Sequence, residues 1–304
     1  MTRILGIDTS NYTTSVAVVE DGRVIYDERC ILNVKMGEKG LRQSEALFQH
    51  INNLPLLLNT PLVRGINAVC VSEKPRPVEG SYMPVFKAGI SVGMSISNAL
   101  GVPFYKTSHQ EGHIEAASRS IGFKSDSFIA IHMSGGTTEV LKVSFDVEGY
   151  EIEIIGGTKD ISFGQLVDRI GVALGLSFPA GKYMDEYALE IKETSLRIPS
   201  HVEGLYFNLS GQETMGLKYV NSGYNHKEVA FAVMLCIGKT LEKVIKNLQK
   251  DIKLPVLLIG GVASSKFLRL YFKSRGYNDI HFSDERYASD NAAGTAYIGS
   301  TKYK

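Results

Sequence analysis

The chain has 304 residues, which suits two domains of ordinary size and is too long for one small core. Its 33 Lys and Arg residues nearly balance its 32 Asp and Glu residues, which excludes a global basic field but leaves a local basic patch open. The cysteines, Cys30, Cys70 and Cys236, are widely spaced in apolar runs, which argues against a disulfide framework or a CxxC metal site. The N-terminus enters a strand pattern directly, and no apolar run is long enough to span a bilayer. We therefore expect a cytoplasmic protein without membrane contact.

The first part of the chain is predicted to form a mixed α/β unit. Strands are expected at residues 3–8, 14–20 and 23–31, with an Asp21-Gly22 hairpin turn between the last two. A helix around residues 40–58 follows, and Pro55 is expected to break it near its end. A strand at 66–72, a helix from Pro84 to Leu100 and a strand at 103–107 complete this part.

The second part is predicted to repeat the same order of elements. Its expected elements are strands at 127–132, 138–144 and 150–155, helices near 163–174 and 226–249, a strand at 255–259, a helix near 264–273 and a final helix after Ser289. Residues 7–16 align without gaps with residues 131–140, and five of the ten pairs are identical. The alternative is that two hairpins share turn chemistry by chance. Because the same strand order also recurs downstream, duplication is the better interpretation.

Two such units would each place a polar turn beside a central cleft, and these turns suit phosphate oxygens. Gly135-Gly136 would let the backbone approach a phosphate without a side chain in the way. Gly260-Gly261 follows a buried strand and precedes a helix, whose N-terminus adds partial positive charge. The chain contains no GxxxxGKS or GxxxxGKT loop, so a nucleotide would not be held as in P-loop proteins.

The segment from His109 to His113 is the strongest metal signal in the sequence. On a helix the two imidazoles lie one turn apart on the same face, close enough to share a metal ion. Zinc proteases carry a glutamate base directly after the first histidine, but here that residue is Gln110, which cannot accept a proton. Glu111 would point to the opposite side. The alternative is a pair of surface histidines.

Two further residues are predicted to complete this metal site. His132 ends the first strand of the second unit, where the first unit has Asp8, and Asp290 begins the final helix. His109, His113, His132 and Asp290 would give three nitrogen ligands and one oxygen ligand, a set that suits Zn or Fe(II) better than Mg. A helix cap is the alternative role for Asp290.

These motifs resemble, in order, those of the transferase subunit of tRNA threonylcarbamoyladenosine synthase, a family once described as O-sialoglycoprotein endopeptidases. The resemblance covers nearly the whole chain. The matching segments are Ile7–Ser10, the HxEGH motif at His109–His113, Ser134–Thr138, Thr158–Arg169, Pro179–Gly181, Leu209–Gly211, Gly260–Ala263 and Asp290–Ala293. HxEGH combined with the DNA element at Asp290 is the specific part of this pattern.

The resemblance implies an α/β protein with duplicated actin/hexokinase-like (ribonuclease H-like) domains and a central cleft. It implies transfer of a threonylcarbamoyl group to N6 of adenosine 37 in tRNAs that read ANN codons. It also implies one divalent metal ion (Fe or Zn), ATP or an adenylate, and a heterodimer with a related actin-like subunit and an ATPase subunit. His109, His113 and Asp290 would be metal ligands, and His132 falls where archaeal members place a tyrosine ligand. The nucleotide-binding residues would be Met133, Ser134, Gly135, Gly136, Thr137, Asp168, Gly181, Asp185, Gly260, Gly261 and Ser265.

The chain departs from the family pattern at positions that carry charge or hydrogen bonds. Tyr12 and Thr13 replace two carboxylates thought to act in catalysis, so no catalytic residue is assigned and Asp8 and Ser10 are minor candidates. Thr137, Gln165, Glu213 and Ser265 replace a histidine, a glutamate, a lysine and an asparagine. These changes indicate a divergent paralogue. The alternatives are a carbamoyltransferase or ATP-dependent enzyme with another acceptor, and a non-catalytic scaffold subunit.

We expect a first lobe at residues 1–107, with the C-terminal helix at about 290–304 packed near it. A second lobe at residues 108–289 would carry the nucleotide loops.

Overall fold

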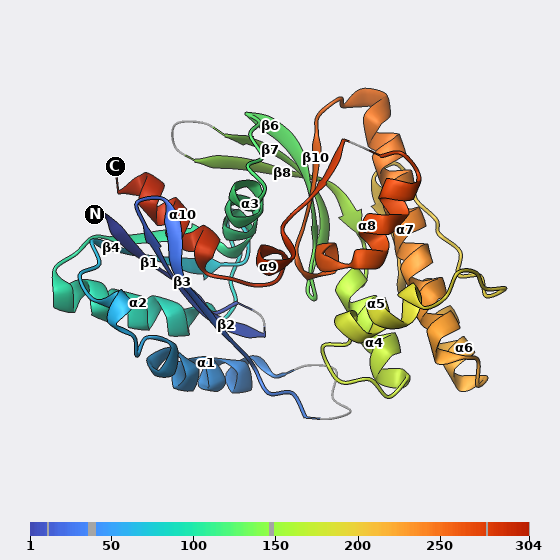
Figure 1. Ribbon diagram of the computed structural model, residues 1–304, viewed down its shortest axis with the longest axis horizontal. Helices are drawn as coiled ribbons and strands as arrows, with labels where there is room; N and C mark the ends of the chain where they lie inside the picture. Colours follow the sequence, from blue (N-terminus) through green and yellow to red (C-terminus); the bar gives the residue numbers. More distant parts are fainter. Residues whose placement is uncertain (11, 36–40, 146–148, 278, 304) are drawn as a thin grey trace. The chain divides into compact units, whose positions relative to one another are not determined.

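The computed structural model describes residues 1–10, 12–35, 41–145, 149–277 and 279–303 (Figure 1). The chain divides into two compact units. The first contains Met1–Asn33, Gly40–Lys124 and Arg286–Lys304, and the second contains Val34–Lys39 and Ser125–Glu285. The main division therefore falls after Lys124, one helix later than the predicted boundary at residue 107. The physical reason is that helix α3 (His109–Ser120) packs against α10 (Ala293–Lys302) within the first unit.

The first unit is built on a five-stranded mixed sheet. Its order is β3-β2-β1-β4-β5, formed by β1 (Arg3–Asp8), β2 (Thr13–Glu20), β3 (Arg23–Ile31), β4 (Ala68–Lys74) and β5 (Phe104–Ser108). The first three strands are antiparallel, whereas β1, β4 and β5 are parallel. Helices α1 (Gln43–Leu57) and α2 (Phe86–Leu100) cover one face, and α3 and α10 lie on the other (Figure 1).

Alternation along β1 sends successive side chains to opposite faces of this sheet. Leu5 and Ile7 join the core under α1 and α2. Gly6 faces α10, because a Cβ built on it would lie 2.5 Å from the carbonyl oxygen of Ala292. Asp8, two residues further, therefore points to the same face as α3 and α10. This periodicity places a carboxylate beside the helix of the HQEGH segment.

The second unit contains a six-stranded sheet in the order β11-β10-β6-β7-β8-β9. Its strands are β6 (Ser127–Met133), β7 (Thr138–Phe145), β8 (Tyr150–Thr158), β9 (Tyr206–Phe207), β10 (Val256–Ile259) and β11 (Ile280–Phe282). Taken from β8 to β11, the order and directions repeat those of the first sheet from β3 to β5. The duplication predicted from the sequence is confirmed as a shared topology.

The helices of the second unit enclose its core. They are α4 (Phe163–Ala173), α5 (Gly181–Leu189), α6 (Ser210–Asn221), α7 (His226–Asp251) and α8 (Lys266–Ser274), and the short α9 (Glu285–Ala288) follows at the division between the units. The long α7 buries Val233, Ile237, Leu241 and Val244 against the rest of the core. Its apolar residues recur at helical spacing, which is why the sequence predicted this helix.

Several predicted details are wrong or shifted. Pro55 does not break α1 but lies inside it, and residue 40 of the predicted helix lies outside the described residues. The helix predicted from Pro84 begins at Phe86. The elements α5, β9, α6, β11 and α9 were not predicted.

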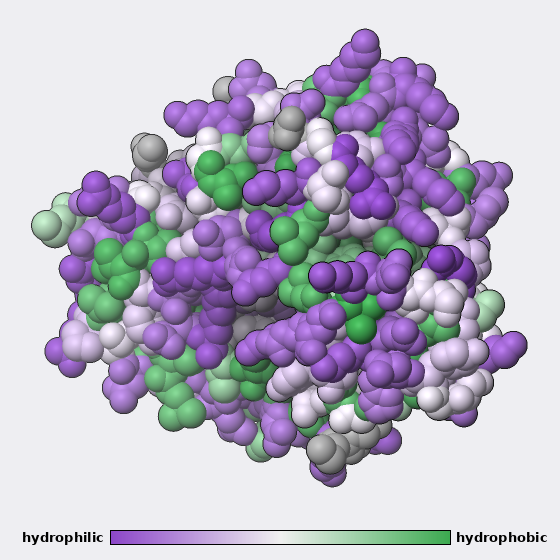
Figure 2. Space-filling view, turned by 45° about the vertical axis from the view of Figure 1, so that its right-hand side comes forward, coloured by the Kyte–Doolittle hydropathy of each residue, from purple (hydrophilic) through white to green (hydrophobic). Residues whose placement is uncertain are grey.

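The surface is mostly hydrophilic on the face shown in Figure 2, where hydrophobic residues form separate patches. Among the helices of the described residues, none is both long and apolar enough to cross a membrane.

Candidate functional site

Helix α3 begins with a capping box that fixes the orientation of its first turn. The Ser108 hydroxyl accepts from the Glu111 backbone N–H at 3.2 Å, and Glu111 Oε2 accepts from the Ser108 N–H at 2.6 Å. Glu111 Oε2 also accepts from Thr107 Oγ1 at 3.0 Å. The glutamate of the HQEGH segment therefore has a structural role at the helix start. His109 and His113 lie on one helix face, with ring centroids 4.4 Å apart.

Helix α10 crosses α3 through backbone contact. A Cβ built on Gly294 would lie 1.8 Å from the carbonyl oxygen of Gly112, so only glycine fits at this crossing. Asn291 Oδ1 accepts from the backbone N–H groups of Ala293 at 3.1 Å and Gly294 at 3.4 Å. The Asn291 side chain therefore caps α10 by accepting hydrogen bonds from its first backbone N–H groups. The alternative role of Asp290 as a helix cap is wrong.

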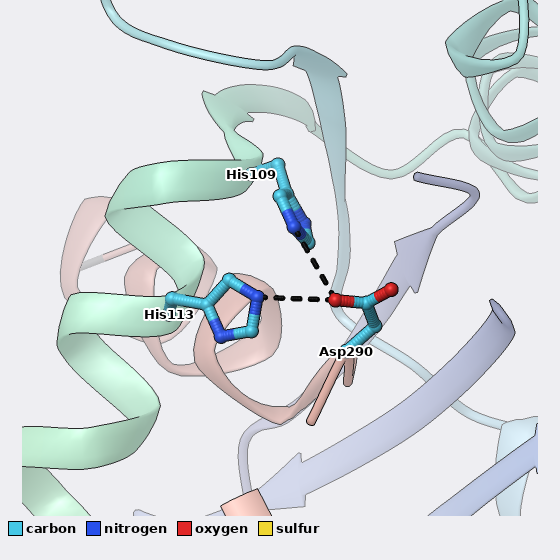
Figure 3. A group of neighbouring side chains, drawn as sticks. All are labelled: His109, His113 and Asp290. Atoms are coloured by element: carbon cyan, nitrogen blue, oxygen red, sulfur yellow. Dashed lines mark hydrogen bonds and ion pairs between the residues drawn. The ribbon is translucent and has the colours of Figure 1, made fainter. Parts of the chain in front are cut away.

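The close crossing brings Asp290 to the two histidines (Figure 3). Asp290 Oδ1 lies 3.2 Å from His113 Nε2 and 3.6 Å from His109 Nε2. One ligand atom from each of the three residues lies within 4.8 Å of the other two, and all three side chains are largely buried. Two imidazole nitrogens and a carboxylate oxygen in this arrangement fit one Fe(II) or Zn ion. The alternative of two surface histidines is wrong, because the side chains of His109 and His113 are only 12% and 2% exposed.

Asp8 lies on the Nδ1 side of the His109 ring, whereas Asp290 lies on the Nε2 side. Asp8 Oδ2 lies 3.0 Å from His109 Nδ1, and Asp8 Oδ1 accepts from the Ser10 backbone N–H at 2.9 Å and from the Ser10 hydroxyl. A carboxylate bonded to one ring nitrogen fixes the tautomer and orientation of a metal-binding histidine. Sequence reasoning named Asp8 and Ser10 without finding this contact. The sequence feature that could have indicated this contact is an aspartate on the face of a buried strand that α3 covers.

The charges in this group are strongly coupled. Burial would raise the pKa of the Asp8 carboxyl, but the charge of His109 and its hydrogen bond hold that pKa well below its usual range. Burial would lower the pKa of His109, but Asp8 and then Asp290 raise it to about 9. Burial and the positive charge of His109 lower the pKa of His113. Without a cation the group thus holds its positive charge on His109, and a bound cation would take the place of that proton.

The second unit contains the predicted nucleotide turn between β6 and β7. The Ser134 hydroxyl accepts from the N–H groups of Gly136 at 3.2 Å and Thr137 at 3.0 Å, so these two donors are used within the turn. The start of α4 lies against the turn, because the Ser162 hydroxyl donates to the Gly135 carbonyl at 3.1 Å. A Cβ on Gly164 would lie 2.4 Å from the Ser134 carbonyl oxygen. The positive end of α4 therefore lies beside the turn.

Gly260 follows β10 at the same sheet edge as this turn. It has a φ of 90°, and a Cβ on it would lie 2.5 Å from the Met133 carbonyl oxygen. The Met133 side chain is fully buried in the core. His132 is also buried in the second unit, with Nδ1 3.5 Å from Thr137 Oγ1. Coordination of the metal by His132 stays a prediction.

Asp168 and Asp185 each organise a helix start in the second unit. Asp168 Oδ1 accepts from the Ala180 N–H at 2.8 Å, just before α5, and burial raises the pKa of Asp168 to about 6 despite this bond. Asp185 accepts from the Lys266 N–H at 2.9 Å, the Phe267 N–H at 3.2 Å and the Ser265 hydroxyl, all at the start of α8. Both Asp185 oxygens are used there. Nucleotide contact by Asp168, Gly181, Asp185, Gly261 and Ser265 stays a prediction.

Solved structures share this fold at low sequence identity. Full-length HypF in its phosphate- and nucleotide-bound form matches with a TM-score of 0.63 and 11% identity, over 99% of this chain and 55% of that chain. The activator of 2-hydroxyisocaproyl-CoA dehydratase from Clostridium difficile with bound ADPNP matches with a TM-score of 0.57 and 13% identity, over 99% and 96% of the two chains. The duplicated topology and these likenesses define a protein of the actin/hexokinase-like fold class.

Sequence comparison identifies the family within this class. The family model described as TsaD, tRNA N6-adenosine threonylcarbamoyltransferase, matches residues 59–297. A tRNA N6-adenosine threonylcarbamoyltransferase of Thermus thermophilus is 31% identical over 304 residues, covering 95% of this chain and 90% of that protein. One of Thermotoga neapolitana is 29% identical over 318 residues, covering 99% and 94%. The chain belongs to the tRNA N6-adenosine threonylcarbamoyltransferase family, as its motifs predicted, and this is a family of acyltransferases.

Proposed function

We propose that this protein transfers a threonylcarbamoyl group from an adenylate to N6 of adenosine 37 in tRNAs that read ANN codons. The observation that carries the proposal is the buried convergence of His109, His113 and Asp290, with Asp8 behind His109. A non-catalytic scaffold would have no use for three ligands held this closely. Family membership supplies the reaction class.

The metal centre is proposed to hold Fe or Zn. His109 Nε2, His113 Nε2 and an Asp290 oxygen would be its protein ligands, and Asp8 would keep His109 in the tautomer that presents Nε2. When bound, the cation supplies Lewis acidity that can polarise a carbonyl or neutralise a phosphate. Three protein ligands leave coordination positions for a substrate.

The second unit is proposed to bind ATP or the adenylate. The turn from Ser134 to Thr137 lies against the N-terminus of α4, whose partial positive charge favours a phosphate. Among the described residues, no heavy atom lies within 4 Å of a Cβ built on Gly136 or Gly181, so these backbones leave room for a ligand. The Asp168 carboxylate lies one hydrogen bond from Ala180, next to Gly181, and would bind a ribose hydroxyl.

In the transfer step, N6 of adenosine forms a bond to the carbamoyl carbon. The bond between that carbon and the adenylate phosphate oxygen breaks, AMP leaves with the electron pair, and N6 loses one proton. The exocyclic amine is a weak nucleophile, so positioning should supply much of the acceleration. Asp8 already bonds to Ser10 and His109, and we assign it a positioning role instead of the role of a base.

The departure at Glu213 has a structural compensation. Glu213 Oε2 lies 3.0 Å from Arg169 NH1, so the carboxylate that replaces the family's lysine forms an ion pair between α6 and α4.

We further propose a cytoplasmic enzyme, because its substrate is tRNA. We also propose that the protein forms a heterodimer with a related actin-like subunit and works together with an ATPase subunit.

The test is formation of N6-threonylcarbamoyladenosine in a strain that lacks its own transferase. Expression of the wild-type chain should restore the modified nucleoside, measured by mass spectrometry of digested tRNA, and His109→Ala should not. A wild-type protein that is well expressed and binds metal yet restores nothing would favour another acceptor. A wild-type protein that neither restores the modified nucleoside nor binds metal would favour the non-catalytic scaffold.

A further inference from the structure

The segment from Lys74 to Lys87, which joins β4 to the first turn of α2, has both of its ends beside the proposed metal ligands. At one end the Pro75 carbonyl accepts from the Gln110 N–H of the HQEGH helix at 3.0 Å. At the other end the Phe86 ring lies 6.4 Å from the His109 ring. Both ends of the segment therefore lie beside the helix that carries the histidines.

The tip of the segment is ordered by its own hydrogen bonds. The Arg76 N–H donates to the Ser81 hydroxyl at 3.1 Å, and the Ser81 N–H donates to the Val78 carbonyl at 3.3 Å. Gly80 supplies the left-handed conformation of the tip, with a φ of 74°. An ordered tip loses less conformational entropy when it binds a partner.

The exposed side chains of the segment combine an aromatic ring with positive charge. Tyr82 is 62% exposed, and Lys87 Nζ lies 5.9 Å from its ring centroid. Lys87 is exposed, Lys74 and Arg76 are half-buried, and the exposed Glu79 is the carboxylate of the segment. The segment therefore carries more positive than negative charge, with Lys87 as the cation beside the ring. A ring beside cations suits unpaired nucleotides, whose bases stack on aromatic groups while their phosphates attract cations.

We infer that the Lys74–Lys87 segment binds the unpaired nucleotides of the tRNA anticodon loop, with Tyr82 stacking on a base and Lys87 contacting a phosphate. This inference rests on the proposed tRNA substrate and names the element of the first unit that receives it.

The test measures the affinity of the metal-loaded protein for an unmodified tRNA transcript that reads an ANN codon, over a range of salt concentrations. Tyr82→Ala should weaken binding by about 5- to 150-fold, the range for loss of one stacked base. Tyr82→Phe should keep nearly all of the affinity. Lys87→Ala should reduce the slope of log K against log salt by about 0.7, as for one phosphate contact on a single strand.

Arg23→Ala provides the matched control, because Arg23 is an exposed cation at the turn between β2 and β3. It should change neither the affinity for tRNA nor the metal content. A blunt RNA duplex of similar length, which has no unpaired bases, should bind the wild type and Tyr82→Ala alike. Unchanged tRNA affinity in Tyr82→Ala, or equal weakening of tRNA and duplex, would overturn the inference. Failure of the wild type to modify tRNA that it binds would count against the proposed reaction alone.

Discussion

The Asp8 carboxylate divides its oxygens between Ser10 and His109, and this division determines what a substitution there does. An anion beside His109 Nδ1 keeps the proton on that nitrogen and leaves Nε2 to face Asp290. Asparagine would retain an acceptor without the charge, whereas alanine would remove both.

Asp8→Ala should lower metal affinity about 10- to 100-fold, and Asp8→Asn should lower it less. Affinity would be measured by competition with a chromophoric chelator. Asp251→Asn, at an exposed carboxylate near the end of α7, is the control and should bind metal as the wild type does. Equal affinity in Asp8→Ala and the wild type would show that His109 needs no second partner.

Asp168 should make the stability of the second unit depend on pH. Burial raises its pKa to about 6 from an unfolded value of 3.8, so ionisation favours the unfolded chain. The unfolding free energy should therefore fall as pH rises from about 4 to about 6, by about 1–3 kcal/mol. Asp168→Asn keeps an acceptor for the Ala180 N–H and should lose this dependence.

The comparison is urea unfolding of wild type and Asp168→Asn between about pH 4.5 and 7.5. The variant should gain stability relative to the wild type up to about pH 6 and keep a constant advantage above it. The same variant should bind ATP more weakly. Parallel stability profiles would mean that the folded carboxyl titrates as in the unfolded chain.

The sequence predicted which residues lie at the site better than it predicted the role of each one. It could predict that His109 and His113 face the same side, because spacing on a helix is a local property, whereas Asp290 required the predicted order of elements and the family motif. It could not distinguish Asp290 from Asn291 at the start of α10, because both types cap helices and only the crossing with α3 decides which one turns inward. Asp185 bonds across about 80 residues to the start of α8, and no local pattern indicates such a contact.

At the scale of elements, the crossing of α3 and α10 holds the proposed metal ligands His109, His113 and Asp290 together. Gly294→Ala would place a methyl group 1.8 Å from the Gly112 carbonyl oxygen, so the helices must move apart. We expect a loss of about 1–3 kcal/mol in unfolding free energy, as for overpacking, together with weaker metal binding.

Gly211→Ala is the matched control for this prediction. Gly211 is also helical, near the start of α6, but among the described residues no heavy atom lies within 4 Å of a Cβ built there. The control should be neutral or slightly stabilising. Thermal unfolding and metal titration of both variants decide the matter, and a Gly294→Ala protein with full metal affinity would contradict the role of the crossing.

Two glycines near the turn between β6 and β7 are expected to respond differently to substitution. Gly136 lies in the turn, and Gly164 lies in α4 and packs against it. Gly136→Val points into open space and should leave stability unchanged while lowering nucleotide affinity at least about tenfold by calorimetry. Gly164→Ala collides with the Ser134 carbonyl and should lower stability by about 1–3 kcal/mol. Unchanged ATP affinity in Gly136→Val would remove this turn from the nucleotide site.

Long, periodic elements were predictable and short ones were not. The strands at 3–8 and 127–132 are short apolar runs typical of strands buried on both faces, and helix α7 has helical spacing over its length. Strand β9 has two residues and pairs with β8 only because the chain returns there, while α5 starts at a glycine that Asp168 helps to hold. Such elements depend on contacts distant in sequence.

At the scale of the whole molecule, the proposed metal residues and the proposed nucleotide residues belong to different units. Asp8, His109, His113 and Asp290 come from the first unit, although Asp290 is far from the others in sequence. The turn at 134–137 and Asp168, proposed for the nucleotide, come from the second unit. The chain segment from Arg286 onward returns to the first unit, so that unit and its ligand set are complete only when the C-terminal residues have folded.

This separation predicts that metal and nucleotide protect different parts of the chain. In hydrogen–deuterium exchange, Fe or Zn should slow exchange in β1, α3 and α10, while ATP should slow it in the turn at 134–137 and in α4. A ligand at about 100 times its Kd adds about 2.7 kcal/mol to the stability of the unit that binds it, which is about a 100-fold slower opening of that unit. The variant His113→Ala should abolish the first pattern and keep the second. Protection of α3 and α10 by metal in His113→Ala, or of α4 by metal alone, would contradict the assignment of one ligand to each unit.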